Sequence, residues 1–248
     1  MQLDAGAQRF ARRVFPRWLL ERIDPFQAGI DSLVTRASNE TDPGMVVLDA
    51  GAGESRHAPW FAHARYIALD RCIGDPLWDY ASVDVCADLL RLPFAAGSVD
   101  RVLCVVTLEH LADPAAAVIE FARVMKPGGR LYLVTPLMWE EHQAPYDYFR
   151  FTRWGLRDLL QRAGLEVSSI EPVGGFFWMI GRRCVHLASF FQSSWKWILF
   201  PLVGLIAGVL VPLLCYYLDS MDPTKAHTLG HVGVAVRRLS DPPLSDSL

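Results

Sequence analysis

The stretch MVVLDAGAGESRHAPWFAHARYIALD, residues 45–70, decides the fold predicted for this chain. An apolar run opens it, a turn with Gly51 and Gly53 follows, and a second apolar run ends at Asp70. About ten residues between the two runs have the composition of a helix. A strand, a glycine turn, a helix and a strand that ends in an acidic residue make half of a nucleotide-binding βαβ unit.

The residue types of this stretch suit a nucleoside ligand. Glycine tolerates positive φ, so Gly51 and Gly53 let the backbone pass close to a bulky group. A carboxylate at the tip of the second strand can accept hydrogen bonds from both hydroxyls of a ribose. We therefore expect Asp70 to contact the sugar of a bound nucleoside.

The composition indicates a folded chain of one large domain, or of one domain with an insertion. Of its 248 residues, 52% are hydrophobic and 21% are charged, and the formal net charge is −3. These values exclude a disordered chain and give no overall basic field, so we expect no nucleic-acid partner. Residues 1–20 carry four arginines and no long apolar stretch, which predicts no signal peptide.

The five cysteines are odd in number and form no CxxC pair. We interpret them as reduced thiols in the cytosol and expect no metal site. These cysteines are Cys72, Cys86, Cys104, Cys184 and Cys215.

Strand and helix patterns alternate along the rest of the chain. Residues 3–37 are predicted to be helical in pieces, interrupted by Pro16 and Pro25. Asp113 and Thr152 are predicted helix N-caps. Strands are predicted at 83–86, 100–106, 131–134, 165–173 and 231–239, and helices at 114–126 and 152–163. The alternation favours an α/β fold with a parallel sheet, in which the apolar strand 100–106 is buried on both faces.

Four motifs occur in a fixed order. They are LDAGAG at 48–53, ALD at 68–70, ADLLRLPF at 87–94, and VTLEHLADP at 106–114 with RVMKPGGRLYLVTP at 123–136. Their order and spacing resemble the class I S-adenosylmethionine-dependent methyltransferases, in particular the type 11-like group, over most of residues 45–180. The resemblance implies a Rossmann-like seven-stranded sheet flanked by helices, S-adenosyl-L-methionine as cofactor, and transfer of a methyl group.

The resemblance also implies roles for individual residues. The first motif would surround the methionine part of the cofactor, Asp70 would hold the ribose hydroxyls, and Asp88 would meet the adenine amino group. The expected cofactor-binding residues are Asp49, Gly51, Ala52, Gly53, Asp70, Asp88, Leu89 and Thr107. Ser55 stands where the family has a third glycine, and we expect it to cap the following helix while cofactor binding is retained.

Residues on the acceptor side are predicted from the segment EEHQAPYDYFRFT at 140–152, which resembles a stretch found in a bacterial subgroup linked to cell-surface glycans. It follows the fifth strand, so it should overhang the methyl group. His142 and Tyr146 are candidate catalytic residues, and His110 is another, because a neutral imidazole can accept a proton. Asp147 and Arg150 are further candidates on the acceptor side. The alternative for this segment is a packed aromatic loop with a surface salt bridge, and the alternative for His110 is a structural histidine bonded to backbone.

The stretch before the last strand is unusually apolar. Trp197–Leu218 is a run of 22 uncharged residues, long enough to span a bilayer. A single span would separate the last strand from its sheet, so we expect a hairpin with arms at 176–191 and 195–218 and a turn at 192–194. Polar residues spaced as on one face of the first arm suggest a helix at a lipid interface. They are Arg182, Arg183, His186 and Ser189.

These patterns predict a helical leader at 1–44, a methyltransferase core at 45–175 with 226–240, and an apolar insertion at 176–225. We expect a cytoplasmic protein, peripheral or monotopic at the cytosolic face of the membrane through 176–218. The alternative for the insertion is a hydrophobic lid or a dimer interface, and the sequence assigns no oligomeric state.

The expected acceptor is a small molecule, a lipid or a glycan, for example a lipid-linked or glycan intermediate at the membrane. One alternative is a non-catalytic, membrane-tethered module that binds S-adenosylmethionine. The other is a Rossmann dinucleotide oxidoreductase, which the sequence disfavours. Arg56 occupies the place of that fingerprint's third glycine, and the segments LPF at 92–94 and KPGG at 126–129 do not belong to it.

Overall fold

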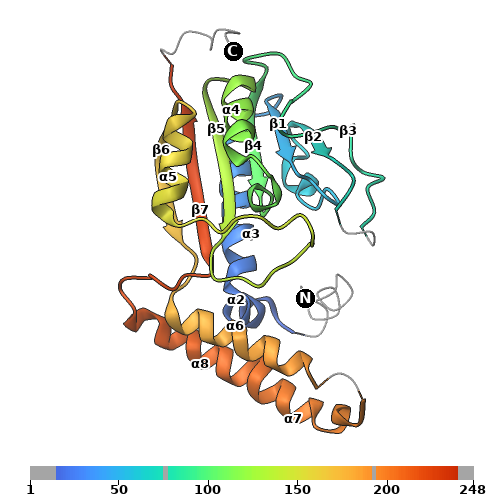
Figure 1. Cartoon of the computed structure of the whole chain (residues 1–248), viewed down its shortest axis with the longest axis vertical. Helices are drawn as coiled ribbons and strands as arrows, with labels where there is room; N and C mark the ends of the chain where they lie inside the picture. The colour runs from blue at the N-terminus through green and yellow to red at the C-terminus, as the bar shows by residue number, and fades with distance from the viewer. Residues whose placement is uncertain (1–14, 75–77, 192–193, 240–248) are drawn as a thin grey trace. The chain divides into compact units, whose positions relative to one another are not determined.

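The computed structural model describes residues 15–74, 78–191 and 194–239 of the chain. Seven strands form one sheet in the order β3-β2-β1-β4-β5-β7-β6 (Figure 1). They are β1 (Val46–Ala50), β2 (Arg65–Asp70), β3 (Val85–Cys86), β4 (Val99–Val105), β5 (Met125–Pro136), β6 (Leu165–Pro172) and β7 (Gly230–Arg237). The predicted seven-stranded Rossmann-like sheet is confirmed. Predicted leader residues 1–14, turn residues 192–193 and residue 240 lie outside the described residues.

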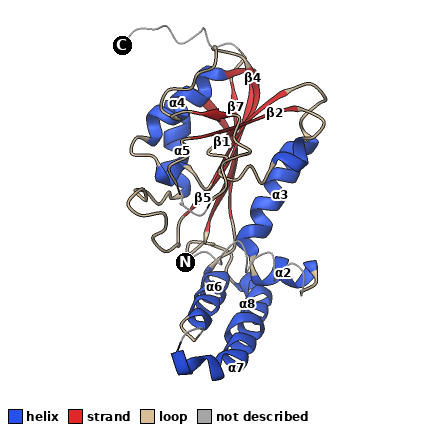
Figure 2. Ribbon diagram, turned by 90° about the vertical axis from the view of Figure 1, so that its right-hand side faces the viewer, coloured by secondary structure: helices blue, strands red, loops and turns tan. Residues whose placement is uncertain are grey.

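Helices flank this sheet, with α4 and α5 on one face and α3 on the other (Figure 2). The α-helices are α2 (Arg17–Ile23), α3 (Pro25–Asn39), α4 (Pro114–Val124), α5 (Arg153–Arg162), α6 (Phe176–Ser189), α7 (Phe200–Leu205) and α8 (Val211–Leu218). The short elements are η1 (Ala58–Phe61), η2 (Leu108–His110), η3 (Ser194–Ile198), the π-helical η4 (Ile206–Leu210) and η5 (Asp219–Met221). The predicted N-caps are confirmed. Asp113 accepts a hydrogen bond from Ala116 N at 3.0 Å, and Thr152 accepts one from Gly155 N at 3.1 Å.

The chain divides into two compact units. We call residues 15–29, 137–140 and 172–230 the hairpin unit, and residues 30–136, 141–171 and 231–239 the core unit. The domain boundaries predicted from the sequence were drawn from composition instead, and they stay a prediction.

Parallel pairing organises the middle of the sheet. β1 pairs in parallel with β2 and β4, β2 with β3, and β4 with β5. The carboxyl ends of these strands therefore meet at one edge of the sheet, where α/β proteins place their ligands. Three consecutive residues of β4, Val102, Leu103 and Cys104, are at most 1% exposed, which confirms a strand buried on both faces.

The sequence predicted a parallel sheet throughout, and this part of the prediction is wrong because the sheet is mixed. Val173, just after β6, donates to Gly230 O at 2.8 Å and accepts from Leu229 N at 3.3 Å. The end of β6 thus meets the start of β7, so these neighbouring strands run antiparallel. The reason is that residues 174–228 leave the sheet and return at the same place, which turns the last strand around.

The prediction of a helix between the first two strands is wrong. In its place the chain makes turns and the four-residue 3-10 helix η1. Gly51, Gly53 and Ser55 have φ values of +87°, +52° and +54°, whereas an α-helix needs negative φ. Ser55 therefore does not cap a helix. It occupies the glycine-like conformation itself, and its hydroxyl donates to Ser82 O at 2.9 Å.

A carboxylate fixes the end of α3 against the sheet of the core unit. Glu40 accepts hydrogen bonds from Arg36 Nε at 2.8 Å and from the Tyr132 hydroxyl at 2.6 Å, and it pairs with Arg130. Burial of Glu40 opposes its ionisation, but these three donors lower its pKa to about 2. Because Arg130 and Tyr132 lie on β5, the ionised carboxylate ties helix to strand.

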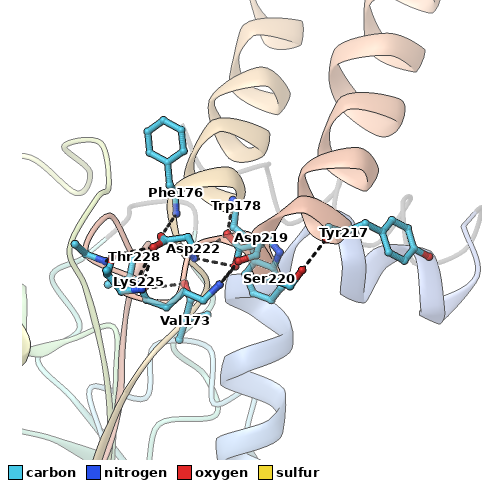
Figure 3. Close-up of polar contacts among 12 residues, drawn as sticks. Val173, Phe176, Trp178, Tyr217, Asp219, Ser220, Asp222, Lys225 and Thr228 are labelled. Atoms are coloured by element: carbon cyan, nitrogen blue, oxygen red, sulfur yellow. Dashed lines mark hydrogen bonds and ion pairs between the residues drawn. The ribbon is translucent and has the colours of Figure 1, made fainter.

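Two aspartates close the base of the hairpin unit (Figure 3). Asp219, 4% exposed, accepts from Gly175 N and Trp178 N at 3.1 Å and from Lys225 Nζ at 2.6 Å. Asp222 accepts from Phe176 N at 2.9 Å. Both carboxylates thus satisfy the free N–H groups at the start of α6, where negative charge is favourable. They tie the beginning of the first arm to the end of the second.

The two predicted arms pack directly on each other. A Cβ added to Gly181 of α6 would lie 3.2 Å from Cys215 Cβ and from Pro212 Cα, both on α8. Only a small residue permits so close an approach of two helices. Arg182 and Arg183 pair with Glu140 at 2.7 and 3.2 Å inside the hairpin unit, and the lipid interface expected for them stays a prediction.

The buried His231 makes the stability of the core unit depend on pH. It is 2% exposed, and burial together with the nearby Arg153 charge lowers its pKa from 6.5 to about 4. The unfolded chain therefore binds more protons than the native one between these values, so stability falls as pH drops from about 6.5 towards 4. We expect His231→Gln to remove about 2 to 3 kcal/mol of this loss, measured by urea unfolding at several pH values. Parallel pH profiles of the two proteins would contradict this role.

Candidate active site

The glycine turn after β1 folds back onto the end of β2. Gly51 N and Ala52 N both donate to Leu69 O, at 2.9 and 3.0 Å. Gly53 N donates to Asp70 Oδ2 at 2.9 Å, and Cys72 N donates to Asp70 Oδ1 at 2.8 Å. The Asp70 carboxylate is therefore held beside the turn, as the sequence predicts for a group that contacts a nucleoside.

The end of β4 reaches the same turn through Thr107. A Cβ on Gly51, whose φ is +87°, would lie only 2.2 Å from Thr107 Cγ2. Thr107 is itself fixed, because its hydroxyl donates to Val105 O at 3.1 Å. Glycine is thus required at position 51 for two reasons, its backbone conformation and the close approach of Thr107.

The first acidic residue of the motif is buried in the core unit. Asp49 is 1% exposed, and its Oδ2 accepts from the Tyr66 hydroxyl and lies 3.0 Å from His57 Nδ1. Burial and the charge of Asp49 raise the pKa of Tyr66, which keeps its hydroxyl protonated as a donor. Among the described residues, Asp49 Oδ1 has no hydrogen-bond partner. One buried acceptor of Asp49 is thus left open by the part of the chain that the structure describes.

Sequence reasoning missed both partners of Asp49. The register pairs Asp49 with Ala68, and Tyr66 stands two residues earlier on β2, so it shares the face of Ala68. Strand alternation was the signal that could have found Tyr66. No comparable signal marks His57, because it lies in the irregular turn.

The second acidic residue lies at the tip of the neighbouring strand. β2 and β3 pair Asp70 with Cys86, and Asp88 follows Cys86 by two residues at the same edge of the sheet. Asp88 Oδ1 accepts from Leu90 N at 3.0 Å, and its Oδ2 lies 3.7 Å from Arg71 Nε. The carboxylate is 42% exposed, so it is open to a ligand, whereas Leu89 is buried at 3% exposure.

Two aromatic residues that the sequence did not single out lie near the site, Trp78 against the glycine turn and Tyr80 against Gly74. A Cβ on Gly53 would lie 3.0 Å from Trp78 Cζ3, and one on Gly74 would lie 2.8 Å from the Tyr80 hydroxyl. The rings of Trp78 and Tyr80 have centroids 6.2 Å apart. Both belong to the irregular stretch between β2 and β3, which has no periodic pattern that would reveal them.

The predicted catalytic residues come together from two loops. The rings of His110 and His142 meet edge to face, with centroids 4.6 Å apart. Tyr146 contributes its carbonyl oxygen, which lies 2.5 Å from His110 Nδ1, and its side chain is 39% exposed. This backbone contact of His110 was one of the two alternatives left open by the sequence.

The loop also contains an ion pair, but the pair is largely buried, with side chains 23% and 5% exposed, and is not the surface salt bridge of the other alternative. Arg150 donates to Asp147 Oδ1 at 2.6 Å, and this bond lowers the pKa of Asp147 to about 2. Asp147 Oδ2 accepts from His142 N at 2.9 Å. Tyr148 N donates to Glu109 O at 2.9 Å, so the loop is pinned to the residue before His110. Glu109 is fully buried, and sequence reasoning missed it although it is a charged residue in an apolar segment.

Comparison with known proteins identifies the domain. Residues 48–133 match the family model described as a methyltransferase domain. The chain is 31% identical over 125 residues to methyltransferase GfsG of Streptomyces halstedii, covering 44% of this chain and 45% of that protein. It is 34% identical over 137 residues to a probable S-adenosylmethionine-dependent methyltransferase of Mycolicibacterium smegmatis, covering 50% and 53%. The matches thus span about half the length of these curated relatives.

Solved structures share the fold. The [4+2]-cyclase SpnF is similar with a TM-score of 0.56 at 18% identity, over 84% of this chain and 82% of that chain. A Burkholderia thailandensis 1,6-didemethyltoxoflavin-N1-methyltransferase is similar with a TM-score of 0.50 at 17% identity, over 93% and 90%. At these identities the likeness concerns the fold alone, and the fold hosts more than one reaction.

The order of the motifs, the strand order and the family match agree. Residues 48–133 thus form a methyltransferase domain, and the chain is similar to S-adenosylmethionine-dependent methyltransferases over about half its length.

The contact between Gly51 and Thr107 gives a test with a matched control. Gly44 has nearly the same φ, +84° against +87°, but a Cβ there meets nothing within 4 Å. We expect Gly44→Ala to cost about 1–2 kcal/mol of unfolding free energy through its backbone conformation. Gly51→Ala should cost about 1–3 kcal/mol more, because it also overpacks against Thr107. Urea unfolding of both variants measures the difference. Equal losses of unfolding free energy would show that contact with Thr107 adds no cost to Gly51→Ala.

Proposed function

We propose that this chain transfers the methyl group of S-adenosylmethionine to a lipid-linked or glycan acceptor at a membrane surface. The observation that carries the methyl-transfer part is the meeting of the glycine turn, Asp70 and Thr107 at one edge of the sheet. It supports a bound adenosyl group there, in a domain of the methyltransferase family. The acceptor class is supported by the loop at 140–152, which resembles a segment from enzymes of glycan pathways.

Each cofactor contact has a residue suited to it. Asp70 would accept hydrogen bonds from the ribose hydroxyls, and the half-exposed Asp88 would accept one from the adenine amino group, with Leu89 beside it. The turn from Gly51 to Gly53 would lie against the methionine part, beside the buried Asp49, whose Oδ1 accepts from no donor in residues 15–74, 78–191 and 194–239.

Methyl transfer depends mainly on how the enzyme positions the methyl donor and the acceptor. S-adenosylmethionine supplies an electrophilic methyl group on a sulfonium sulfur, and its displacement needs no covalent enzyme intermediate. Holding the two reactants in line contributes roughly 7–11 kcal/mol to such a reaction. A general base adds typically about 10²–10⁴-fold where the acceptor must lose a proton. In the metal-free protein, His110 of η2 and His142 of the loop at 140–152 are the groups that would serve, since they follow β4 and β5 at the carboxyl edge.

Binding of the cofactor tests the proposed site directly. We expect calorimetric titration to give one S-adenosylmethionine per chain. Asp70→Asn should weaken binding about 10- to 100-fold, because hydrogen bonds to a charged acceptor contribute about 1.5–3 kcal/mol. Asp158→Asn is the matched control, since this carboxylate is 59% exposed on α5 and pairs only at the surface with Arg162. It should leave the affinity unchanged.

Other outcomes separate the alternatives. Unchanged affinity in Asp70→Asn would contradict the ribose contact. Binding of a nicotinamide dinucleotide in place of S-adenosylmethionine would favour an oxidoreductase. The proposal expects labelled methyl groups to appear in the lipid or glycan fraction of a membrane extract, whereas a non-catalytic module would bind the cofactor and transfer no label.

The membrane part of the proposal rests on the hairpin unit. Within the described residues, one helical segment, Phe200–Met221, is long and apolar enough to cross a membrane, and only 17% of its most apolar window is buried. Its exposed side chains form a continuous apolar series with those of η3. The series consists of Trp197, Ile198, Leu199, Leu202, Leu205, Ile206, Leu210, Leu214 and Tyr217. We choose a lipid surface as the partner because the run at 197–218 carries no charge and has the length of a bilayer span.

Vesicle flotation tests this surface. We expect the protein to float with vesicles of phosphatidylcholine and phosphatidylglycerol. The double variant Leu202→Asp, Leu214→Asp replaces side chains that are 59% and 58% exposed on the hairpin and should lower the bound fraction on the order of tenfold or more, because aspartate is strongly disfavoured in hydrocarbon. The control Ile119→Asp, Trp154→Asp changes side chains 46% and 70% exposed on α4 and α5 and should still float. Loss of flotation in both, or in neither, would contradict the proposal.

A further inference from the structure

A buried carboxylate beside the candidate catalytic histidines has no hydrogen-bond partner. Glu109 of η2 is 0% exposed, and within residues 15–74, 78–191 and 194–239 no donor bonds either of its carboxylate oxygens. A buried carboxylate without a partner is costly, so such groups are normally paired, protonated or bound to a metal ion. Glu109 therefore indicates a missing positive partner.

Two imidazole nitrogens face this carboxylate at equal distance. Glu109 Oε1 lies 3.7 Å from His110 Nε2 and 3.7 Å from His142 Nε2. These separations are too long for hydrogen bonds. Two atoms bonded to one ion at about 2.1 Å lie at most about 4.2 Å apart, so both separations fit a shared ion. All three ligand atoms lie within 4.8 Å of one another.

The far sides of both imidazoles are held by oxygen atoms. His110 Nδ1 lies 2.5 Å from Tyr146 O, and His142 Nδ1 lies 3.4 Å from Asp147 Oδ2. Metal-bound histidines almost always donate their other ring N–H to a carbonyl or a carboxylate, which fixes the ring and its tautomer. Arg150 holds Asp147 in turn, at 2.6 Å. The loop thus supplies the outer support that such a site needs.

We propose that Glu109, His110 and His142 bind one divalent first-row transition-metal ion through Oε1 and the two Nε2 atoms. Two imidazoles and one carboxylate suit zinc, iron, cobalt or manganese and not calcium, which takes oxygen ligands. Three protein ligands leave coordination positions open for an oxygen atom of another molecule. The sequence had predicted no metal site, but that expectation rested on the cysteines, and none belongs to this cluster.

The location of the metal site beside the glycine turn suggests which ligand would fill the open coordination positions of the ion. Glu109 follows Thr107 by two residues, and Thr107 touches the glycine turn. An oxygen of the methyl acceptor would therefore be the ligand of the ion. This assignment rests on the proposed function, whereas the metal site itself does not.

Metal titration of the full chain tests the site without reference to methyl transfer. After treatment with a chelator and dialysis, we expect one equivalent of Zn²⁺ or Co²⁺ per chain by elemental analysis, and visible absorption bands with Co²⁺. Glu109→Gln and His142→Gln should each weaken binding at least about tenfold, by the scale of losses known for metal sites. His63→Gln is the matched control, because that histidine bonds Thr41 O outside the cluster, at 2.9 Å, and its variant should bind metal normally.

A second measurement guards against misfolded variants. Metal should raise the melting temperature of the wild-type protein and of His63→Gln, but not that of Glu109→Gln. Circular dichroism of the metal-free variants confirms that they are folded. The proposal would be overturned if the wild-type protein bound no Zn²⁺ or Co²⁺ at about 100 micromolar, a concentration on the order of the dissociation constant of a weak surface site. It would also be overturned if Glu109→Gln bound the metal as tightly as the wild-type protein. S-adenosylmethionine titration of the same metal-free sample shows separately whether the proposed function holds.

Discussion

The parallel pairing of β1 with β2 and β4 is the constraint on which the candidate site depends. It brings three strand ends to one edge, and each end then contributes a different group there: a glycine turn, a carboxylate and Thr107. The groups fit only because the turn has no side chain at position 51. The Asp70 carboxylate in turn accepts from Gly53 N, so this hydrogen bond joins the turn directly to the acid.

The sheet could be predicted from the sequence because buried parallel strands are continuous apolar runs, and because capping residues mark α4 and α5. The helix after the first strand could not. Its composition is compatible with a helix, yet Gly51, Gly53 and Ser55 adopt positive φ, which the sequence does not reveal when one of the three is a serine. The direction of β7 also escaped prediction, because it depends on where the apolar insertion returns to the sheet.

The candidate site shows the same division. Asp70 and Asp88 could be placed at one edge from motif order alone, since each follows a strand of a parallel pair. The cluster around Glu109 needed tertiary structure, because His142 joins it from a loop that is distant in sequence. Tyr146 shows a further limit: the sequence made it a candidate catalytic residue, whereas the atom that meets His110 is its backbone carbonyl oxygen. Patterns of side chains carry no information about contacts that the backbone makes.

The antiparallel pairing of β6 and β7 explains how the chain can carry a long apolar insertion in its sheet. Residues 174–228 begin and end beside each other, joined by the hydrogen bonds of Val173 with Leu229 and Gly230. Asp219 closes the insertion a second time by accepting from Gly175 N at the start of the first arm. These hydrogen bonds join the two ends of the insertion, so the pairing of β6 with β7 does not depend on contacts made by the helices between them. Because the hairpin returns to the place where it left, β6 and β7 remain neighbours in one sheet across a long insertion.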